Sequence, residues 1–151
     1  MVKILSDNNL YTRTYVHKIL YLLSHDNCFE PTVYGPYCAG VQRILQYIEN
    51  NPNVIYKWYS ETGPEIRRKI NEVTKFIKQN DISTTELSYI AKLDYLLNTI
   101  KAESIYDVDL SALNQKSIIL GWLEFCEFTN ERLEELWCKL DEIREILIER
   151  T

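Results

Sequence analysis

Apolar residues recur every three or four positions along most of this chain, which is the period of one face of an α-helix. The clearest example follows Thr62, where Ile66, Ile70, Val73 and Ile77 are separated by four, three and four positions. Glycine and proline occur only four times each in 151 residues, and both are uncommon inside helices. The chain is therefore predicted to be mainly α-helical. The expected helices cover residues 12–24, 38–50, 62–79, 81–97, 104–113, 115–128 and 129–151.

Two of these helices have a predicted start signal. Thr62 with Glu65, and Ser83 with Glu86, have the spacing of a capping box, in which each side chain satisfies a backbone N–H of the first turn.

Two stretches in the first half of the chain interrupt the helical pattern. Pro31 and Pro36 each push the preceding residue toward an extended conformation, so residues 29–37 cannot be helical throughout. Residues 54–60 are rich in β-branched and aromatic side chains and predict a short strand.

The resulting order of helix, corner, helix, strand, turn and helix is typical of a winged-helix unit. Residues 1–80 are therefore predicted to be winged-helix-like, with the small β element at 54–60 forming part of the wing. This part is expected to pack on a C-terminal helical bundle formed by residues 81–151. The chain has no internal repeat, low-complexity tract or linker, which predicts a single domain over residues 1–151.

The composition narrows the class of protein. Apolar residues make up 46% and charged residues 26%, as in ordinary folded proteins. No apolar run reaches the roughly 18 residues of a transmembrane helix, and the N-terminus lacks the apolar stretch of a signal peptide. We therefore expect a cytoplasmic protein that does not enter membranes. Its four cysteines are then expected to be free thiols.

A short YGPY motif at residues 34–37 joins the first two predicted helices. Together with Lys18 and Tyr21 in the preceding helix, it resembles the "qKLlYl … YGPYS" pattern of small bacterial and archaeal proteins. It is more distantly similar to the Panacea antitoxin domain. Cys38 stands where that pattern has a serine, which weakens the presumed helix cap because cysteine caps helices poorly.

This resemblance implies a non-catalytic helical domain in an antitoxin, adaptor or host-defence context. It extends loosely over residues 87–97 and 119–140, which look like the central and closing helices of that group. We accordingly predict a protein-interaction module with a protein partner of unknown identity. Exposed aromatic residues are common binding anchors, so the predicted contact residues are Tyr34, Tyr37, Tyr56 and Trp58.

The last predicted helix, residues 129–151, offers a second surface. It carries seven acidic and four basic residues around an apolar stripe spaced by three and four. That stripe suits either packing on the protein's own core or the seam of a homodimer.

DNA binding is the first alternative, because the second helix of a winged-helix unit often enters the major groove. The net charge of −5 means that such binding would need a local basic patch. The candidate residues for this patch are Gln42, Arg43, Gln46, Lys57, Arg67, Arg68 and Lys69.

A small zinc site is the second alternative, because His17, His25, Cys28 and Cys38 lie within 22 residues. Only His25 and Cys28 have the close spacing of a zinc-ligand pair, so no metal ligand is assigned and no cofactor is expected. The chain has no phosphate-binding loop, dinucleotide fingerprint or HExxH motif. The sequence therefore predicts that the protein is not an enzyme.

Overall fold

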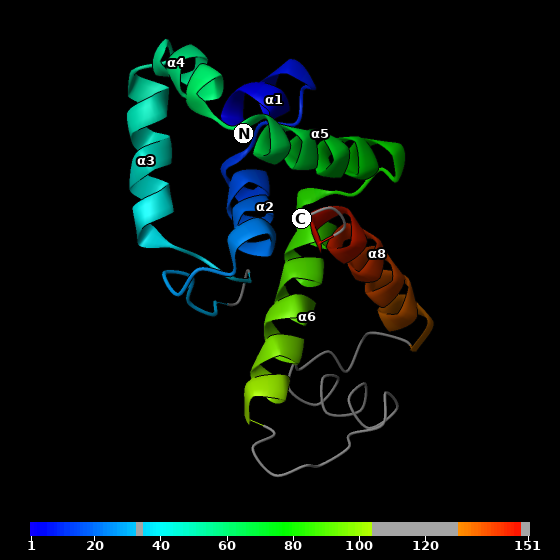
Figure 1. Cartoon of the computed structure of the whole chain (residues 1–151). Helices are drawn as coiled ribbons and strands as arrows, with labels where there is room; N and C mark the ends of the chain where they lie inside the picture. Colours follow the sequence, from blue (N-terminus) through cyan, green and yellow to red (C-terminus); the bar gives the residue numbers. More distant parts are fainter. Residues whose placement is uncertain (33–34, 104–129, 149–151) are drawn as a thin grey trace.

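The computed structural model describes residues 1–32, 35–103 and 130–148, and it is mainly α-helical, as the sequence predicts (Figure 1). The helices in these ranges are α1 (Val2–Asp7), α2 (Arg13–Ser24), α3 (Ala39–Asn50), α4 (Val54–Glu61), α5 (Pro64–Gln79), α6 (Thr84–Glu103) and α8 (Asn130–Ile148).

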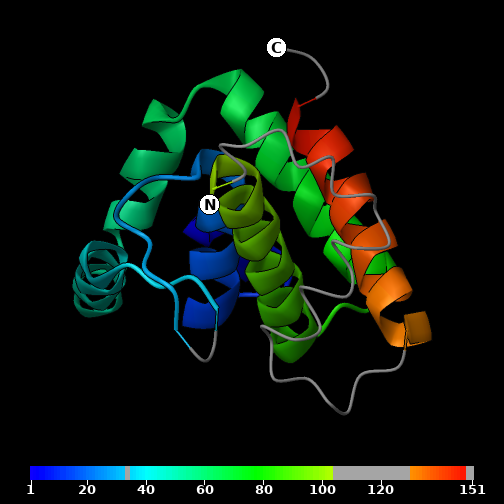
Figure 2. The ribbon, with the colours of Figure 1, turned by 90° about the horizontal axis from the view of Figure 1, so that it is seen from below.

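Helices α2 and α6 occupy the middle of the molecule, with α3 at one edge and α8 on the opposite side (Figures 1 and 2). α2 packs against both α6 and α3, while α8 packs against α5 and α6. The short α1 contacts α4 and α5. Helices α2, α5, α6 and α8 therefore form the packed body of the molecule, and α3 and α4 lie at its periphery.

The hydrophobic core follows the apolar spacing of the sequence. The stripe of α8, formed by Leu133, Leu136, Leu140 and Ile143, is buried, so the core-packing interpretation of this stripe is confirmed. Burying each such side chain contributes about 1.5–3 kcal/mol. In α5 the stripe is buried from Ile70 onward.

The predicted strand at residues 54–60 is wrong, because these residues form α4. Its half-buried residues are Val54, Ile55 and Tyr59, and the exposed residues Tyr56, Lys57 and Trp58 lie between Ile55 and Tyr59. An interval of four between Ile55 and Tyr59 places both on one side of a helix. A run this short cannot be assigned to helix or strand from its apolar content alone, and tertiary packing overrides β-propensity.

A wing would also require a paired strand. In the described parts of the chain, β pairing is limited to one isolated antiparallel bridge between Glu30 and Tyr37. The winged-helix-like layout predicted for residues 1–80 therefore lacks its β element.

The two predicted capping boxes have different outcomes. Ser83 Oγ accepts a hydrogen bond from the Glu86 N–H at 3.1 Å, as predicted. The Glu86 carboxylate instead binds Lys139 and Arg132 of α8. At α5 the cap is Gly63, with Pro64 in the first turn, and the Thr62 hydroxyl donates to the Trp58 carbonyl at 2.7 Å.

The helices predicted at 104–113 and 115–128 lie outside the described residues. The short α1 was missed from the sequence because six residues show too little apolar periodicity.

Candidate functional site

Helices α3 and α4 expose large apolar side chains. Ile44 is 52%, Tyr47 53% and Trp58 37% exposed. α3 buries only Leu45 and Ile48 among its residues, and Ile44 and Tyr47 each precede one of these by a single position. One position is about 100° around a helix, so Ile44 and Tyr47 point away from the core.

Tyr47 and Trp58 stack on each other across the turn between α3 and α4. Their ring centroids are 6.1 Å apart and their planes differ by 22°. Ile44 lies three positions before Tyr47 and is therefore its neighbour on the α3 surface. We call these three residues the α3–α4 patch. This contact holds the side chains of Tyr47 and Trp58 against each other.

The predicted contact residues do not all belong to this patch. Tyr56 is 62% exposed, but it lies two positions before Trp58 and so about 160° from it around α4. Tyr37 lies before the first residue of α3, whereas Tyr47 lies eight positions into that helix, about 12 Å along its axis from Ala39. Its ring stacks on His17 with centroids 5.0 Å apart. Tyr34 lies outside the described residues.

Sequence reasoning missed Ile44 and Tyr47. Ile44 belongs to the apolar stripe of the helix predicted at residues 38–50, and such residues are expected to be buried. The signal that could have identified them is the width of the apolar surface, since Ile44, Leu45, Tyr47 and Ile48 cover more of the helix than its packing against α2 buries.

The charges beside the patch come from both helices. Arg43 and Lys57 are exposed, and no carboxylate of the described residues lies within ion-pair distance of either. Glu49 is engaged by Arg13, whose guanidinium holds the pKa of the Glu49 carboxyl below its usual range. The outer end of α3 is therefore a mixed apolar and basic surface.

The DNA-binding candidates are distributed over three helices. Gln42 is half-buried, and Arg43, Gln46 and Lys57 are exposed. On α5, Arg68 pairs with Glu72 at 3.2 Å, and Lys69 lies 4.0 Å from Glu65.

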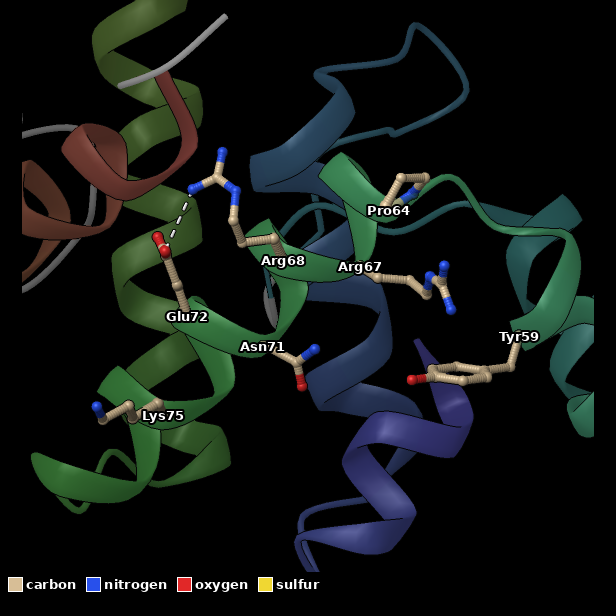
Figure 3. A pocket seen from close by; sticks show the side chains of 7 residues that line it. All are labelled: Tyr59, Pro64, Arg67, Arg68, Asn71, Glu72 and Lys75. Atoms are coloured by element: carbon tan, nitrogen blue, oxygen red, sulfur yellow. Dashed lines mark hydrogen bonds and ion pairs between the residues drawn. The ribbon is translucent and has the colours of Figure 1, made fainter.

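An open groove runs beside α5 and carries two of these cations (Figure 3). The Arg67 guanidinium lies over the Tyr59 ring, 5.2 Å from its centroid, whereas Arg68 extends away from it toward Glu72. The two arginines therefore do not converge on one ligand position.

The corner at Gly35 and Pro36 is held by a buried lysine and a close backbone contact. Lys18 is only 4% exposed, and its Nζ donates to the Pro36 carbonyl at 2.8 Å. Burial lowers the pKa of Lys18 to about 8. Gly35 has a φ of +96°, and a Cβ there would lie 3.1 Å from the Ser88 carbonyl oxygen. Lys18, Gly35 and Pro36 thus fasten the corner onto α2 and α6.

The two histidines considered as zinc ligands are engaged in other interactions. The two ring nitrogens of His17 face the carbonyls of Arg13 and Cys38, at 3.0 and 3.2 Å. His25 Nε2 is 2.8 Å from an Asp94 carboxylate oxygen. In the part of the chain that is described, no three His, Cys, Asp or Glu side chains are grouped as a metal site would require.

Asp94 is the centre of a buried ionic cluster that joins three helices. It is fully buried on α6, and its carboxylate binds His25 at the end of α2 and Arg144 of α8. Burial opposes ionisation, but the His25 hydrogen bond and the Arg144 charge outweigh it and lower the pKa of Asp94. The cluster connects α2, α6 and α8, and removing one of its charges would leave the others without their partner.

None of the described helices is both long enough and apolar enough to cross a bilayer. Comparisons of this chain with protein-family models, with curated proteins and with solved structures give no match.

Proposed function

We propose that this protein is a non-enzymatic protein-interaction module and that its partner binds across the α3–α4 patch. The observation that carries the proposal is the exposed, pre-stacked pair of Tyr47 and Trp58 beside Ile44. Tyrosine and tryptophan are enriched among the residues that dominate binding energy. Because the stacked rings are already ordered, a partner would lose less side-chain entropy on binding.

The partner that suits this surface is a protein segment with an apolar side chain to cover the rings and a carboxylate to meet Arg43. The resemblance of the YGPY corner to antitoxin-like proteins supports an antitoxin or adaptor role in a host-defence or mobile-element context. In this proposal the corner itself is scaffold, because Lys18 and Gly35 are buried in it.

The experiment compares the tagged protein with two variants in its native host. Trp58→Ala removes half of the stacked pair, while Tyr56→Ala removes an equally aromatic, exposed side chain from the far side of α4. We expect a specific protein to co-purify with the parent and with Tyr56→Ala. Binding to Trp58→Ala should be about 30-fold weaker, as for a residue worth about 2 kcal/mol. Equal recovery with both variants would reject the patch.

The salt dependence of the affinity distinguishes DNA binding from the proposed protein binding. Binding that relies on phosphate contacts falls steeply as salt rises, since counterions are released. Two of the candidate cations on α5, Arg68 and Lys69, are close to carboxylates, so we do not propose this function. DNA affinity that drops with salt and depends on Arg43 and Lys57 would overturn our choice.

A further inference from the structure

The groove beside α5 is lined by residues of α4 and α5 and has a volume of about 380 Å³. Arg67 and Asn71 extend from the side of α5 that faces Tyr59, and the Tyr59 hydroxyl points toward α5 (Figure 3). Arg68 and Lys75 extend the other way. Arg67 and Asn71 are four positions apart and are therefore neighbours on the α5 surface. A guanidinium, an amide and a phenol hydroxyl thus lie around the α4 end of the groove.

These three groups have no hydrogen-bond partner within the described ranges. Neither the Asn71 amide nor the Tyr59 hydroxyl makes a hydrogen bond there. The Arg67 Nε is buried and has no acceptor among the same residues, and the Arg67 Cζ lies 5.2 Å from the Tyr59 ring centroid. The face of a tyrosine ring attracts a cation, but it offers no oxygen atom to accept the N–H groups. The site therefore contains three unused donors, one of them charged.

The neighbouring carboxylates are engaged by other cations. Glu72 binds Arg68 at 3.2 Å, and Asp7 of α1 binds Lys3 at 2.7 Å. The Lys3 ammonium also lies 4.6 Å from the centroid of the tyrosine ring that Arg67 contacts. Arg67 is thus a partly buried cation with no counter-ion among the described residues. A partly buried, unpaired charge favours the binding of an anion from outside the chain.

We propose that the α4 end of this groove binds an oxyanion, the phosphate or carboxylate group of a small organic ligand. The planar guanidinium of Arg67 matches the paired oxygens of either group, and Asn71 and Tyr59 supply two further donors. The volume of the groove is within the range of small-molecule sites. The proposal is independent of the proposed function, because no residue of the α3–α4 patch lines the groove.

The test is an NMR titration of the ¹⁵N-labelled full chain with inorganic phosphate and, separately, with acetate, at constant ionic strength. The Arg67 Nε–H and the Asn71 side-chain amide each give a signal from the site itself. We expect both signals to shift and then saturate, with half of the shift reached at about 1 mM, the affinity that two or three charge-assisted hydrogen bonds supply. The oxyanion that saturates the signals at the lower concentration identifies the ligand group as phosphate or carboxylate.

Three variants separate this site from general attraction to the basic side chains of α5. Arg67→Gln removes the guanidinium and should weaken binding at least about tenfold, measured on the Asn71 amide signal. Asn71→Ala removes an exposed side chain with one neutral donor group and should weaken binding about fivefold. The control is Lys78→Gln, which removes an exposed cation of α5 that does not line the groove and should leave the affinity unchanged. Circular dichroism checks that each variant is folded.

The proposal is overturned if the shifts rise linearly with anion concentration, or if they are as large around Lys78 as around Arg67. It is also overturned if folded Arg67→Gln and Asn71→Ala bind both anions as the parent does. If Arg67→Gln does not fold, Asn71→Ala decides the question alone, because its side chain has no partner to lose within the described ranges.

Discussion

The α6–α8 side of the molecule and the α3–α4 arm, residues 39–61, use their side chains in opposite ways. On the α6–α8 side the carboxylate of Asp94 is fully buried and is paired with the partly exposed His25 and Arg144. In the arm, α4 has no buried residue at all, and aromatic rings face outward. A helix that contributes so little to the core yet keeps ordered rings on its surface is better suited to binding than to stability. The contrast locates the scaffold and the candidate site on different helices.

The largest expected effect tests the scaffold side of this contrast. Ile90→Ala in the middle of α6 removes a fully buried side chain and should lower the free energy of unfolding by about 4 kcal/mol. The matched change in the arm is Ile44→Ala, which should alter it by less than about 0.5 kcal/mol because that residue is half exposed. Urea denaturation followed by circular dichroism measures both. Similar losses of unfolding free energy in the two variants would contradict the distinction between the α6–α8 scaffold and the α3–α4 arm.

The next largest effect on stability is expected at the ionic cluster around Asp94. Asp94→Asn removes the charge that faces His25 and Arg144, and it should lower the free energy of unfolding by about 3 kcal/mol at neutral pH. The control is Asp141→Asn, an exposed carboxylate on α8, for which we expect almost no change. A small effect of Asp94→Asn would mean that the cluster is dispensable.

The ion pairs of Asp94 and Glu86 make the free energy of unfolding depend on pH. The pKa values of Asp94 and Glu86 are lowered in the folded protein from 3.8 and 4.5, so the unfolded chain takes up protons first on acidification. Their stabilising contribution is therefore complete above about pH 5 and is lost as the pH falls through the folded values. Denaturation midpoints measured from pH 7 to pH 3 should decline below pH 4.5, and less steeply in Asp94→Asn. Parallel curves would show that Asp94 is not involved.

A smaller effect on stability is expected at Gly35 in the corner between α2 and α3. Gly35→Ala forces a side chain into a positive φ and toward the Ser88 carbonyl, which should cost about 2 kcal/mol. Gly63→Ala is the control, because a Cβ there meets no atom within 4 Å. Thermal melts of the two variants should therefore separate clearly, with Gly35→Ala melting at the lower temperature. A neutral Gly35→Ala would contradict the close fit of the corner on α6.

The smallest effect on stability belongs to the α3–α4 patch. Trp58→Ala should lower the free energy of unfolding by only about 1 kcal/mol, the size of one exposed aromatic pair. In the double-mutant cycle with Tyr47→Ala the two losses should not add, since both remove the same contact. A loss as large as that of Ile90→Ala would place these rings in the scaffold.

Several elements were predictable from local rules. The helices around residues 12–24, 38–50 and 62–79 follow from apolar spacing and are found as α2, α3 and α5. Cys38 was expected to be a weak helix cap, and its side chain makes no capping hydrogen bond.

Other features depended on partners that are distant in sequence. Glu86 has the spacing of a capping box, yet its carboxylate binds Lys139, 53 residues away. The strand predicted at residues 54–60 failed for the same reason, because α1 packs against this segment as a helix and the described residues place no strand beside it. For the candidate site, Trp58 was predicted from its residue type, whereas Tyr47 and Ile44 were not.

By itself the sequence determined that this protein is mainly helical and which residues form most of the buried stripes of α5 and α8, because helical period and hydrophobicity act over a few neighbouring residues. Ile66 belongs to the predicted stripe of α5 but is 48% exposed. The tertiary structure alone decided that α3 packs against α2 with only Leu45 and Ile48 buried, and that Asp94 meets Arg144 of α8. Burial and ion pairing both depend on which helices finally pack together, and local sequence rules do not contain that information.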